Sequence, residues 1–225
     1  MICRGAPIGG TILLVLALSQ TALGANGDPQ KRLTAADSHQ ATGVLLTRAD
    51  LGAAGWQSEP GARQSGCGIV LSLNPVESDL VETGEATGPL FSSKGYEALA
   101  QTVRVFATTR QADTAWARTV NKKLVICMEQ QVENISSMGA AVSVTDWSPL
   151  KLPKVGRHVA GFRVTATATS GRTKPKVYLD VILLGQSRTM TKIIFSSLRK
   201  PFSAAYEARL ARIVSQRLDS AQRAG

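Results

Sequence analysis

The clearest pattern in the sequence is an alternation of apolar and polar residues over three consecutive segments, residues 158–169, 177–183 and 189–197. Successive side chains of a β-strand point to opposite faces, so a period of two is typical of a strand with one buried face. Turn-forming residues separate the segments, at Ser170-Gly171 and at residues 185–187. Together the three segments predict an antiparallel meander.

Helical periodicity follows a strand in the middle of the chain. The residues TVRVFAT predict the strand, and residues 110–131 predict the helix. The side chains of Trp116, Val120, Leu124 and Cys127 are spaced four, four and three apart, which places them on one stripe of that helix. We expect this strand and helix to form the scaffold of the fold, since no set of catalytic residues lies on them.

Shorter patterns predict the remaining elements. Thr34 and Ser203 can each cap a helix, because a side-chain oxygen at this position accepts a hydrogen bond from the first helical turn. Strands are expected at residues 89–92, 97–107 and 142–147. The elements predict an α+β fold, a two-layer sandwich in which helices pack on one face of a twisted antiparallel sheet.

Residues 57–88 have a different composition. They are rich in Gly, Ser, Pro, Glu and Asp, and we interpret them as a long irregular segment. Four acidic residues near its end, Glu77, Asp79, Glu82 and Glu85, could bind a cation, but their spacing does not match a calcium-binding loop. We therefore expect these carboxylates to be solvated.

The first residues have the features of a signal peptide. Arg4 supplies a positive charge, residues 8–18 form an apolar run, and Ala22-Leu23-Gly24 provides small residues for cleavage. The run is shorter than the ~20 residues that span a membrane, so we expect cleavage, with an uncleaved anchor as the alternative. The expected organisation is a signal peptide at 1–24, a flexible lead at 25–32 and a single domain at 33–220. We predict that the protein is secreted or held in the cell envelope.

Three cysteines occur, and Cys3 would be removed with the signal peptide. In an exported protein the remaining two, Cys67 and Cys127, usually pair. A disulfide between them would pin residues 57–88 to the central helix and stabilise the fold by about 4 kcal/mol in the chain-entropy model. The alternatives are two reactive thiols, or a thiol enzyme that uses Cys67 as its nucleophile.

The sequence contains no recognisable catalytic or metal-binding set. His39 and His158 are the only histidines, and they lack the spacing of zinc ligands. The Gly-x-Ser-x-Gly elbow of serine hydrolases is missing at residues 185–189, because Arg188 and Thr189 follow Ser187. We therefore predict a protein that is not an enzyme and that binds neither a metal nor a cofactor.

The formal net charge is +10, and the basic residues are scattered along the chain. Aromatic residues do not alternate with them as they do on surfaces that bind single-stranded nucleic acid, so we expect no nucleic-acid partner. The charge favours weak association with anionic lipids or wall polymers. A solvated surface that aids solubility explains the charge equally well.

Several motifs resemble a known family. They are a Leu-Leu-x-x-x-Asp-Leu segment at residues 45–51, Gly55-Trp56, a loop cysteine (Cys67) before Ser78-Asp79-Leu80, a Val-x-Val-Phe strand at residues 103–106, and a following helix with Trp116 and Cys127. Together they resemble the extracellular sensor domain of PknH-type actinobacterial Ser/Thr kinases and its secreted relatives. The resemblance covers about residues 33–220. It implies an α+β sandwich with a ligand-binding cleft between sheet and helices.

The chain also departs from this family. It has neither a kinase domain nor a membrane span, and it has two mature cysteines where the kinase sensor domain holds two disulfides. A signalling role therefore does not transfer, and no ligand-contacting residue can be carried over.

These observations lead to two hypotheses for the function. The first is a secreted or envelope-associated, non-enzymatic binding or sensor-like domain for an extracellular ligand, expected to be a monomer. Its candidate ligand-binding residues form the polar face of the meander: Arg163, Thr165, Tyr178 and Asp180. These four would equally suit an ordinary solvent-facing sheet. The second hypothesis is a basic structural or adhesive envelope protein that binds anionic lipid or wall polymer.

Overall fold

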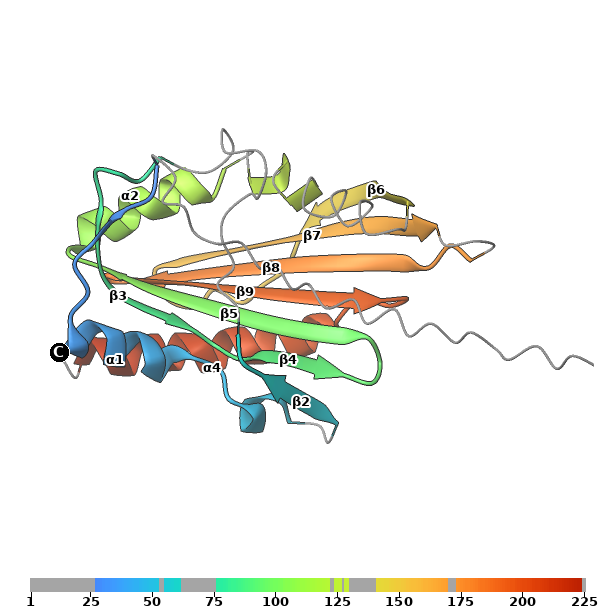
Figure 1. The fold of residues 1–225 in the computed structure, drawn as a ribbon, viewed down its shortest axis with the longest axis horizontal. Coiled ribbons are helices and arrows are strands. Elements are labelled where there is room, and N and C mark those ends of the chain that lie inside the picture. Colours follow the sequence, from blue (N-terminus) through green and yellow to red (C-terminus); the bar gives the residue numbers. More distant parts are fainter. Residues whose placement is uncertain are drawn as a thin grey trace, which may run out of the picture.

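The computed structural model describes residues 27–52, 55–61, 76–121, 124–126, 128–129, 141–169 and 173–223. Within these residues, one nine-stranded sheet carries helices (Figure 1). In chain order the elements are β1 (Gln30–Lys31), α1 (Ala35–Val44), a 3₁₀ helix (Arg48–Leu51), β2 (Trp56–Glu59), β3 (Val81–Thr87), β4 (Leu90–Ser93), β5 (Glu97–Phe106), α2 (Thr109–Thr119), β6 (Ala141–Pro149), β7 (His158–Thr169), β8 (Lys176–Gln186), β9 (Thr189–Leu198) and α4 (Ala204–Arg223). The predicted signal peptide, Cys67 and Cys127 lie outside the described residues, so the cleavage and the disulfide stay predictions.

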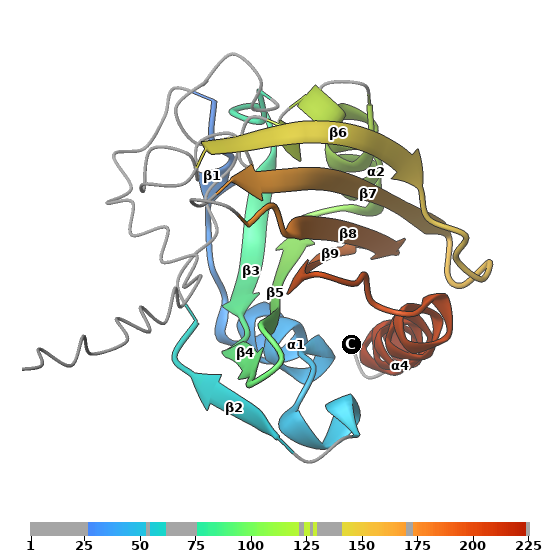
Figure 2. The ribbon, with the colours of Figure 1, turned by 90° about the vertical axis from the view of Figure 1, so that its right-hand side faces the viewer.

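The strands form one twisted sheet. Seven of them follow the order β1-β3-β5-β9-β8-β7-β6, while β4 pairs with β5 and β2 pairs with β4. Among the described strands, β1 and β3 pair in parallel and the other neighbours pair antiparallel. The twist is visible in Figure 2, where β3 runs nearly crosswise to β6.

The meander predicted from the sequence is confirmed as β7, β8 and β9. Both pairings run antiparallel without a shift of register. A tight turn joins β8 to β9 between the paired residues Gln186 and Thr189. Ser187 has a φ of 51° in this turn, the left-handed conformation that two-residue hairpin loops require.

Helices cover both faces of the sheet. α1 and α4 lie on one face, here called the α4 face, and α2 lies on the other, called the α2 face (Figures 1 and 2). The cause is visible in β8, where Val181, Ile182, Leu183 and Leu184 are all buried, so both faces of this strand need an apolar cover. The predicted α+β class is confirmed. The sequence analysis placed helices on one face only, and the structure has them on two.

Each face has its own apolar core, and burial of apolar surface is the main favourable term in folding. The core of the α4 face includes Ala41, Val44, Leu99, Val103, Ile182, Ile193, Phe195, Leu210 and Val214. The core of the α2 face includes Met128, Val164, Ala166, Val177, Leu179, Val181 and Leu183. A smaller cluster beneath α2 consists of Leu80, Phe106, Ala112, Ala115 and Met190.

α2 is shorter than predicted. It ends at Thr119, because Val120 has a ψ of 75° and so leaves the helical conformation. Helical residues resume at 124–126. The predicted apolar stripe survives this break, since Trp116, Val120 and Leu124 all pack against the core of the α2 face.

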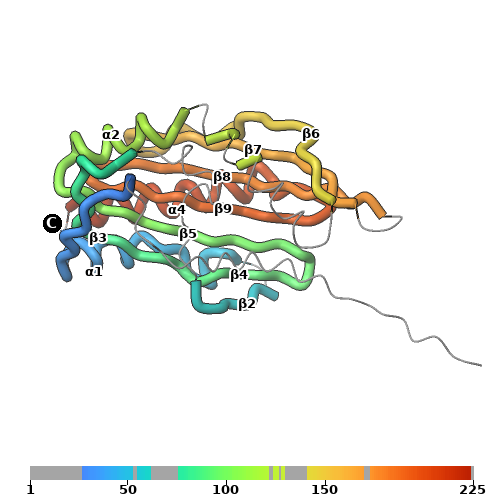
Figure 3. Tube along the Cα trace, turned by 45° about the horizontal axis from the view of Figure 1, so that its top comes forward, coloured from blue at the N-terminus to red at the C-terminus, as the bar shows by residue number. Residues whose placement is uncertain are grey.

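The segment interpreted as irregular, residues 57–88, contains all of β3 and most of β2, so that prediction was wrong for these two strands. β3 lies beside β5 in the sheet (Figure 3). Gly84 permits this, because a Cβ atom at its position would lie 2.4 Å from backbone atoms of Asp37 in α1. Only glycine allows helix and strand to approach so closely.

Arginine–carboxylate pairs fasten the N-terminal elements to the rest of the fold. Arg188, in the turn between β8 and β9, donates to the two carboxylate oxygens of Asp37 at 2.8 and 3.2 Å. Arg217 of α4 donates to both oxygens of Asp50 at 2.8 Å.

The hydrogen bond from Arg188 is the main reason that the pKa of Asp37 is lowered. Burial opposes ionisation of Asp50, but hydrogen bonds from Thr47 and Arg217 outweigh it and lower the pKa of Asp50.

Candidate functional site

The four ligand-binding candidates predicted from the sequence lie together on the α4 face. The register of β7 and β8 pairs Arg163 with Asp180 and Thr165 with Tyr178. Thr165 and Tyr178 are half-buried, whereas Asp180 is buried. The alternation in the sequence therefore placed these side chains on a common face correctly.

Arg163 and Asp180 belong to a charge cluster beneath α4. The Nε and Nη2 atoms of Arg163 donate to the two carboxylate oxygens of Asp180 at 2.6 and 2.7 Å. Nη2 also donates to Oε1 of Glu207 at 3.1 Å and to the carbonyl oxygen of Phe202 at 3.2 Å. Glu207 lies in the first turn of α4, so this cluster ties the start of the helix to the sheet. Arg163, Asp180 and Glu207 are called the α4 cluster below.

Glu207 carries a proton at neutral pH. Asp180 and Glu207 are each 1% exposed. Burial, followed by the hydrogen bond and the negative charge of Asp180, raises the pKa of Glu207 to about 8. A proton on Glu207 serves its hydrogen bond with Asp180, and Arg163 donates to both carboxylate oxygens of Asp180. Within the described residues, no buried side-chain atom of the α4 cluster lacks a hydrogen-bond partner.

The sequence analysis missed Glu207, although a signal for it exists. Leu210 and Val214 follow it at spacings of three and seven, so Glu207 falls on the buried stripe of the closing helix. A carboxyl group on such a stripe needs a buried partner, and Arg163 on the facing strand provides one. Whether the four predicted residues bind a ligand stays a prediction.

A second charge cluster lies on the α2 face and consists of Glu77, Glu82, Arg104 and Lys192, called the α2-face cluster. Arg104 in β5 donates from Nη2 to Oε2 of Glu77 at 2.6 Å and from Nε to Oε2 of Glu82 at 2.9 Å. Glu77 precedes β3, Glu82 lies within β3, and Lys192 lies in β9. The sheet therefore brings together charged residues that are up to 115 positions apart in the chain (77 to 192).

Two carboxylate oxygens of this cluster are buried without a hydrogen-bond partner among the residues that the structure describes. They are the Oε1 atoms of Glu77 and Glu82, residues that are 4% and 2% exposed. Nζ of Lys31 lies 3.9 Å from Oε1 of Glu82, too far for a hydrogen bond, and donates instead to Glu85 at 2.7 Å. An unpaired buried acceptor costs about 1–3 kcal/mol.

Lys192 adds a half-buried cation beside Arg104. Burial, and then the like charge of Arg104, lower the pKa of Lys192 to about 8, against the attraction of Glu77. In the described part of the chain, its ammonium group has no hydrogen bond or ion pair. Burial also outweighs the attraction of Arg104 at Glu82, and raises the pKa of Glu82.

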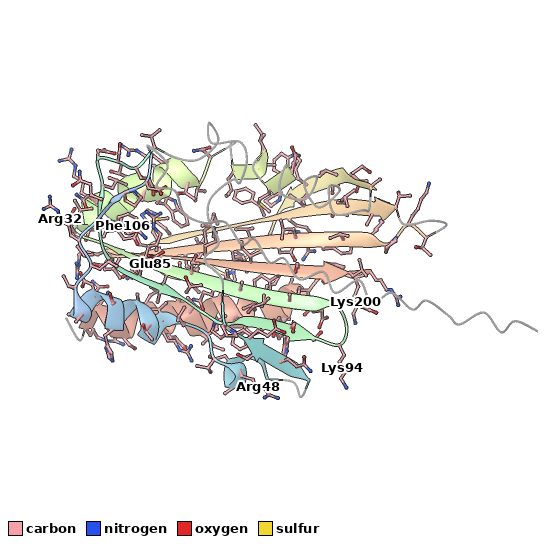
Figure 4. The ribbon with its side chains drawn as sticks, viewed as in Figure 1. Arg32, Arg48, Glu85, Lys94, Phe106 and Lys200 are labelled. Atoms are coloured by element: carbon pink, nitrogen blue, oxygen red, sulfur yellow. The ribbon has the colours of Figure 1, made fainter. Side chains whose placement is uncertain are left out.

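Strand register fixes the relative positions of these groups. Lys192 of β9 is opposite Thr102 of β5, and Arg104 lies two residues further along β5 on the same face. Arg104 is in turn opposite Glu85 of β3, and its guanidinium carbon lies 4.7 Å from the ring centroid of Phe106. Figure 4 labels Glu85 and Phe106, which lie at the same end of the sheet.

The expectation that Glu77 and Glu82 are solvated was wrong. Both are buried, because Arg104 holds them against the sheet. Asp79 is exposed and pairs with Arg118 at the surface. A signal for this cluster exists in the strand TVRVF, because an arginine within an apolar strand needs a buried carboxylate nearby.

His158, the first residue of β7, joins that strand to α2. Its Nε2 atom lies 2.8 Å from Oδ1 of Asp113, and its ring stacks on Trp116 at a centroid distance of 4.9 Å. Arg157 donates to the same carboxylate at 2.7 Å. No described nucleophile is hydrogen-bonded to His158, so these contacts fasten the helix to the sheet.

Two further observations concern the described residues only. They contain no group of three or more His, Cys, Asp or Glu side chains that could hold a metal ion. None of their helices combines the length and the apolar character that crossing a membrane requires. Of the four basic residues labelled in Figure 4, Lys94 and Lys200 lie at one end of the sheet, Arg32 at the opposite end and Arg48 near β2.

The comparisons with known proteins reach the level of a distant likeness of fold. No protein-family model matches the chain, and no curated protein sequence matches it. Among solved structures, the fold is similar to the crystal structure of the extracellular domain of PknH from Mycobacterium tuberculosis, with a TM-score of 0.43 and 9% sequence identity, covering 83% of this chain and 96% of that one. The candidate sites therefore rest on the residues of this chain alone.

Proposed function

We propose that this chain is a non-enzymatic binding domain and that the α2-face cluster is its ligand site. The observation that carries the proposal is that two carboxylate oxygens and one ammonium group in a single cluster have no hydrogen-bond partner among the residues that the structure describes. A ligand with complementary groups would supply the missing hydrogen bonds and recover the free energy that their burial costs. The side chains of Arg104 and Lys31, 26% and 36% exposed, mark the side on which the cluster meets solvent.

Binding is favoured over turnover because Arg104 holds both carboxylates of the cluster in fixed hydrogen bonds. Arg104 is held by both carboxylates, so neither Glu77 nor Glu82 is free to act as a mobile base. An amine with a pKa of about 8 is mostly protonated at neutral pH, which suits it to attract an anionic group. The cluster thus offers fixed charges for recognition.

Two parts of the proposal come from the sequence. Export from the cytoplasm is proposed because the N-terminal residues have the features of a signal peptide. The α4-face residues Arg163, Thr165, Tyr178 and Asp180 are the competing site. Adhesion through positive charge is the competing function, and its binding would weaken steeply with added salt because salt screens charge interactions.

The test is a binding screen with variants of each face. The purified protein is screened by thermal shift and by ligand-observed NMR against a panel of small polar metabolites, each at up to 10 mM, a test concentration at which even weak sites of about 1 mM Kd are mostly filled. The same panel is applied to Lys192→Met on the α2 face and to Tyr178→Phe on the α4 face. Anionic lipid vesicles at low and high salt complete the set.

A compound that binds the wild type and Tyr178→Phe, but not Lys192→Met, supports the proposal. Loss of binding in Tyr178→Phe alone would move the site to the α4 face. Time-dependent consumption of a bound compound would replace binding with catalysis, and vesicle binding that disappears at high salt, with no small-molecule ligand, would favour adhesion. Absence of any binding by the wild type overturns the proposal.

A further inference from the structure

The unpaired groups of the α2-face cluster are of both charge signs, and this constrains what can occupy it. Lys192 presents an ammonium group without a partner among the described residues, while Glu77 and Glu82 present one free carboxylate oxygen each. Arg104 donates to the other two carboxylate oxygens from Nε and Nη2, which leaves the donors of its Nη1 outside these two bonds. The cluster therefore offers cationic donors on Lys192 and Arg104 together with two anionic acceptors.

The charges of the cluster balance before anything binds. The acidic side chains Glu77 and Glu82 are matched in number by the basic side chains Arg104 and Lys192. Beside them, Lys31 lies 3.9 Å from Glu82 and pairs with Glu85 at 2.7 Å, so this neighbouring pair leaves the balance unchanged. In a buried setting with low effective dielectric, an added net charge is costly unless it is compensated. A simple anion would pair with Lys192 but meet two carboxylates. A simple cation would pair with the carboxylates but meet Lys192 and Arg104.

From this balance, and resting on the proposed function of the cluster, we infer that the ligand is a small zwitterion with one ammonium and one carboxylate group. Its carboxylate pairs with Lys192, on β9. Its ammonium group donates to Oε1 of Glu77 and Glu82, on the β3 side of Arg104. Such a ligand pairs with Lys192 and with both free carboxylate oxygens, and it leaves the net charge of the cluster unchanged.

The strand positions also bear on the separation of the two ligand charges. Lys192 on β9 is opposite Thr102 of β5, and Glu82 on β3 is opposite Phe106, four residues further along β5. At ~4.8 Å per strand and ~3.4 Å per residue, this sets the backbones of Lys192 and Glu82 roughly 16 Å apart. Thr102, a half-buried residue directly opposite Lys192, is the neighbour on β5 of the carboxylate end of such a ligand. Affinity will therefore depend on the distance between the ligand's ammonium and carboxylate groups.

The test uses a series of compounds in which only charge and length change. Dissociation constants are measured by isothermal titration calorimetry for glycine, 3-aminopropanoate, 4-aminobutanoate and 6-aminohexanoate. Butylamine and butanoate each carry one of the two charges, and 1,4-butanediol carries neither. For at least one member of the series, we expect affinity at least about tenfold above that of the matched single-charge compounds, the ratio that one recovered charge-assisted hydrogen bond gives.

Variants locate each end of the ligand. Lys192→Met should abolish the preference for the zwitterion over butylamine, and Glu77→Gln should abolish its preference over butanoate. Circular dichroism and thermal melting verify that each variant is folded, and the comparison among compounds on the wild type does not depend on any variant. Equal or tighter binding of butylamine, butanoate or butanediol overturns the inference.

The outcomes separate this inference from the proposed function. If a panel compound that is not a zwitterion binds and is lost in Lys192→Met, the site stands and the ligand class is wrong. If neither the panel nor the amino-acid series binds, both are wrong.

Discussion

The two charge clusters of this protein lie on opposite faces of one sheet. They differ in how completely their buried polar atoms are hydrogen-bonded within the described residues, and a cluster in which all are bonded is called closed. In the α4 cluster, Arg163 holds both oxygens of Asp180, and the protonated Glu207 completes the set. In the α2-face cluster, Arg104 also holds two carboxylates, yet one oxygen of each remains unpaired. The α4 cluster therefore has the properties of a structural tie.

The difference follows from what each face packs against. The α4 face receives the first turn of α4, whose Glu207 and neighbouring Phe202 carbonyl supply the last partners of Arg163. On the α2 face, Lys192 lies across a strand from the two carboxylates and makes no direct contact with them among the described pairs. A closed cluster fixes a helix, whereas an open one leaves hydrogen-bonding capacity for another molecule.

The largest expected effect comes from breaking the closed cluster. Arg163→Met leaves Asp180 and Glu207 buried without a cation, and removal of one partner from a buried ion pair typically costs about 3–5 kcal/mol. Urea unfolding at pH 7 measures this loss. Arg212→Met, at an exposed position of α4, is the control and should change the free energy of unfolding by less than about 0.5 kcal/mol. A loss below about 1 kcal/mol for Arg163→Met would mean that the α4 cluster is not a structural tie.

The next effect is a pH dependence that originates in Glu207. Its pKa is about 8 in the folded protein and near its ordinary value of 4.5 when unfolded. Between these values the folded state keeps a proton that the unfolded state has lost, so this contribution to stability is complete below about pH 4.5 and is lost as the pH rises towards 8. The loss is on the order of a few kcal/mol.

Glu207→Gln isolates this contribution, because the amide keeps a donor towards Asp180 but cannot ionise. We expect the stability of the wild type to fall between pH 5 and pH 8 relative to that of Glu207→Gln. Asp37 and Asp50, whose pKa values are lowered, act only at acidic pH, where stability falls as they are protonated. Parallel curves for the two proteins from pH 5 to 8 would contradict the raised pKa of Glu207.

A substitution in the α2-face cluster should have a smaller effect on the free energy of unfolding, and in the opposite direction. Lys192→Met removes a half-buried ammonium group that lacks a partner among the described residues, so the free energy of unfolding at pH 7 should rise by about 1 kcal/mol. Because the pKa of Lys192 is lowered to about 8 from 10.5, the wild type should regain this difference as the pH rises from 8 to 10. Lys176→Met, at an exposed position of β8, is the control. Destabilisation by Lys192→Met would mean that its charge is satisfied.

These effects also mark what the sequence could and could not predict. The alternation at period two predicted β7, β8 and β9 and placed Arg163 and Asp180 on one face. The alternation could not predict what covers that face. The partner of Arg163 there, Glu207, lies on α4, which follows β8 and β9 in the chain. Helix docking is a tertiary event, and local periodicity carries no information on its geometry.

The wrong prediction of an irregular segment at β3 has a different cause. Glu82 and Gly84 occupy buried positions of this strand, where apolar residues are usual. Glu82 is buried because Arg104 is on the next strand, and Gly84 is there because α1 crosses at that point. Composition therefore suggested a loop, while two contacts distant in the sequence made it a strand. The α2-face cluster was overlooked for the same reason.

The smallest effect tests whether the α4 face has a role beyond structure. Tyr178 and Thr165 are register partners and are half-buried. Neither side chain takes part in the contacts of the α4 cluster, so Tyr178→Phe and Thr165→Val should each change the free energy of unfolding by no more than about 0.5 kcal/mol. Both variants should also bind any ligand of the α2-face cluster as the wild type does. A tenfold loss of affinity in Tyr178→Phe at unchanged stability would instead assign ligand binding to the polar face of the meander. The open cluster on the α2 face would then have to be explained by folding alone.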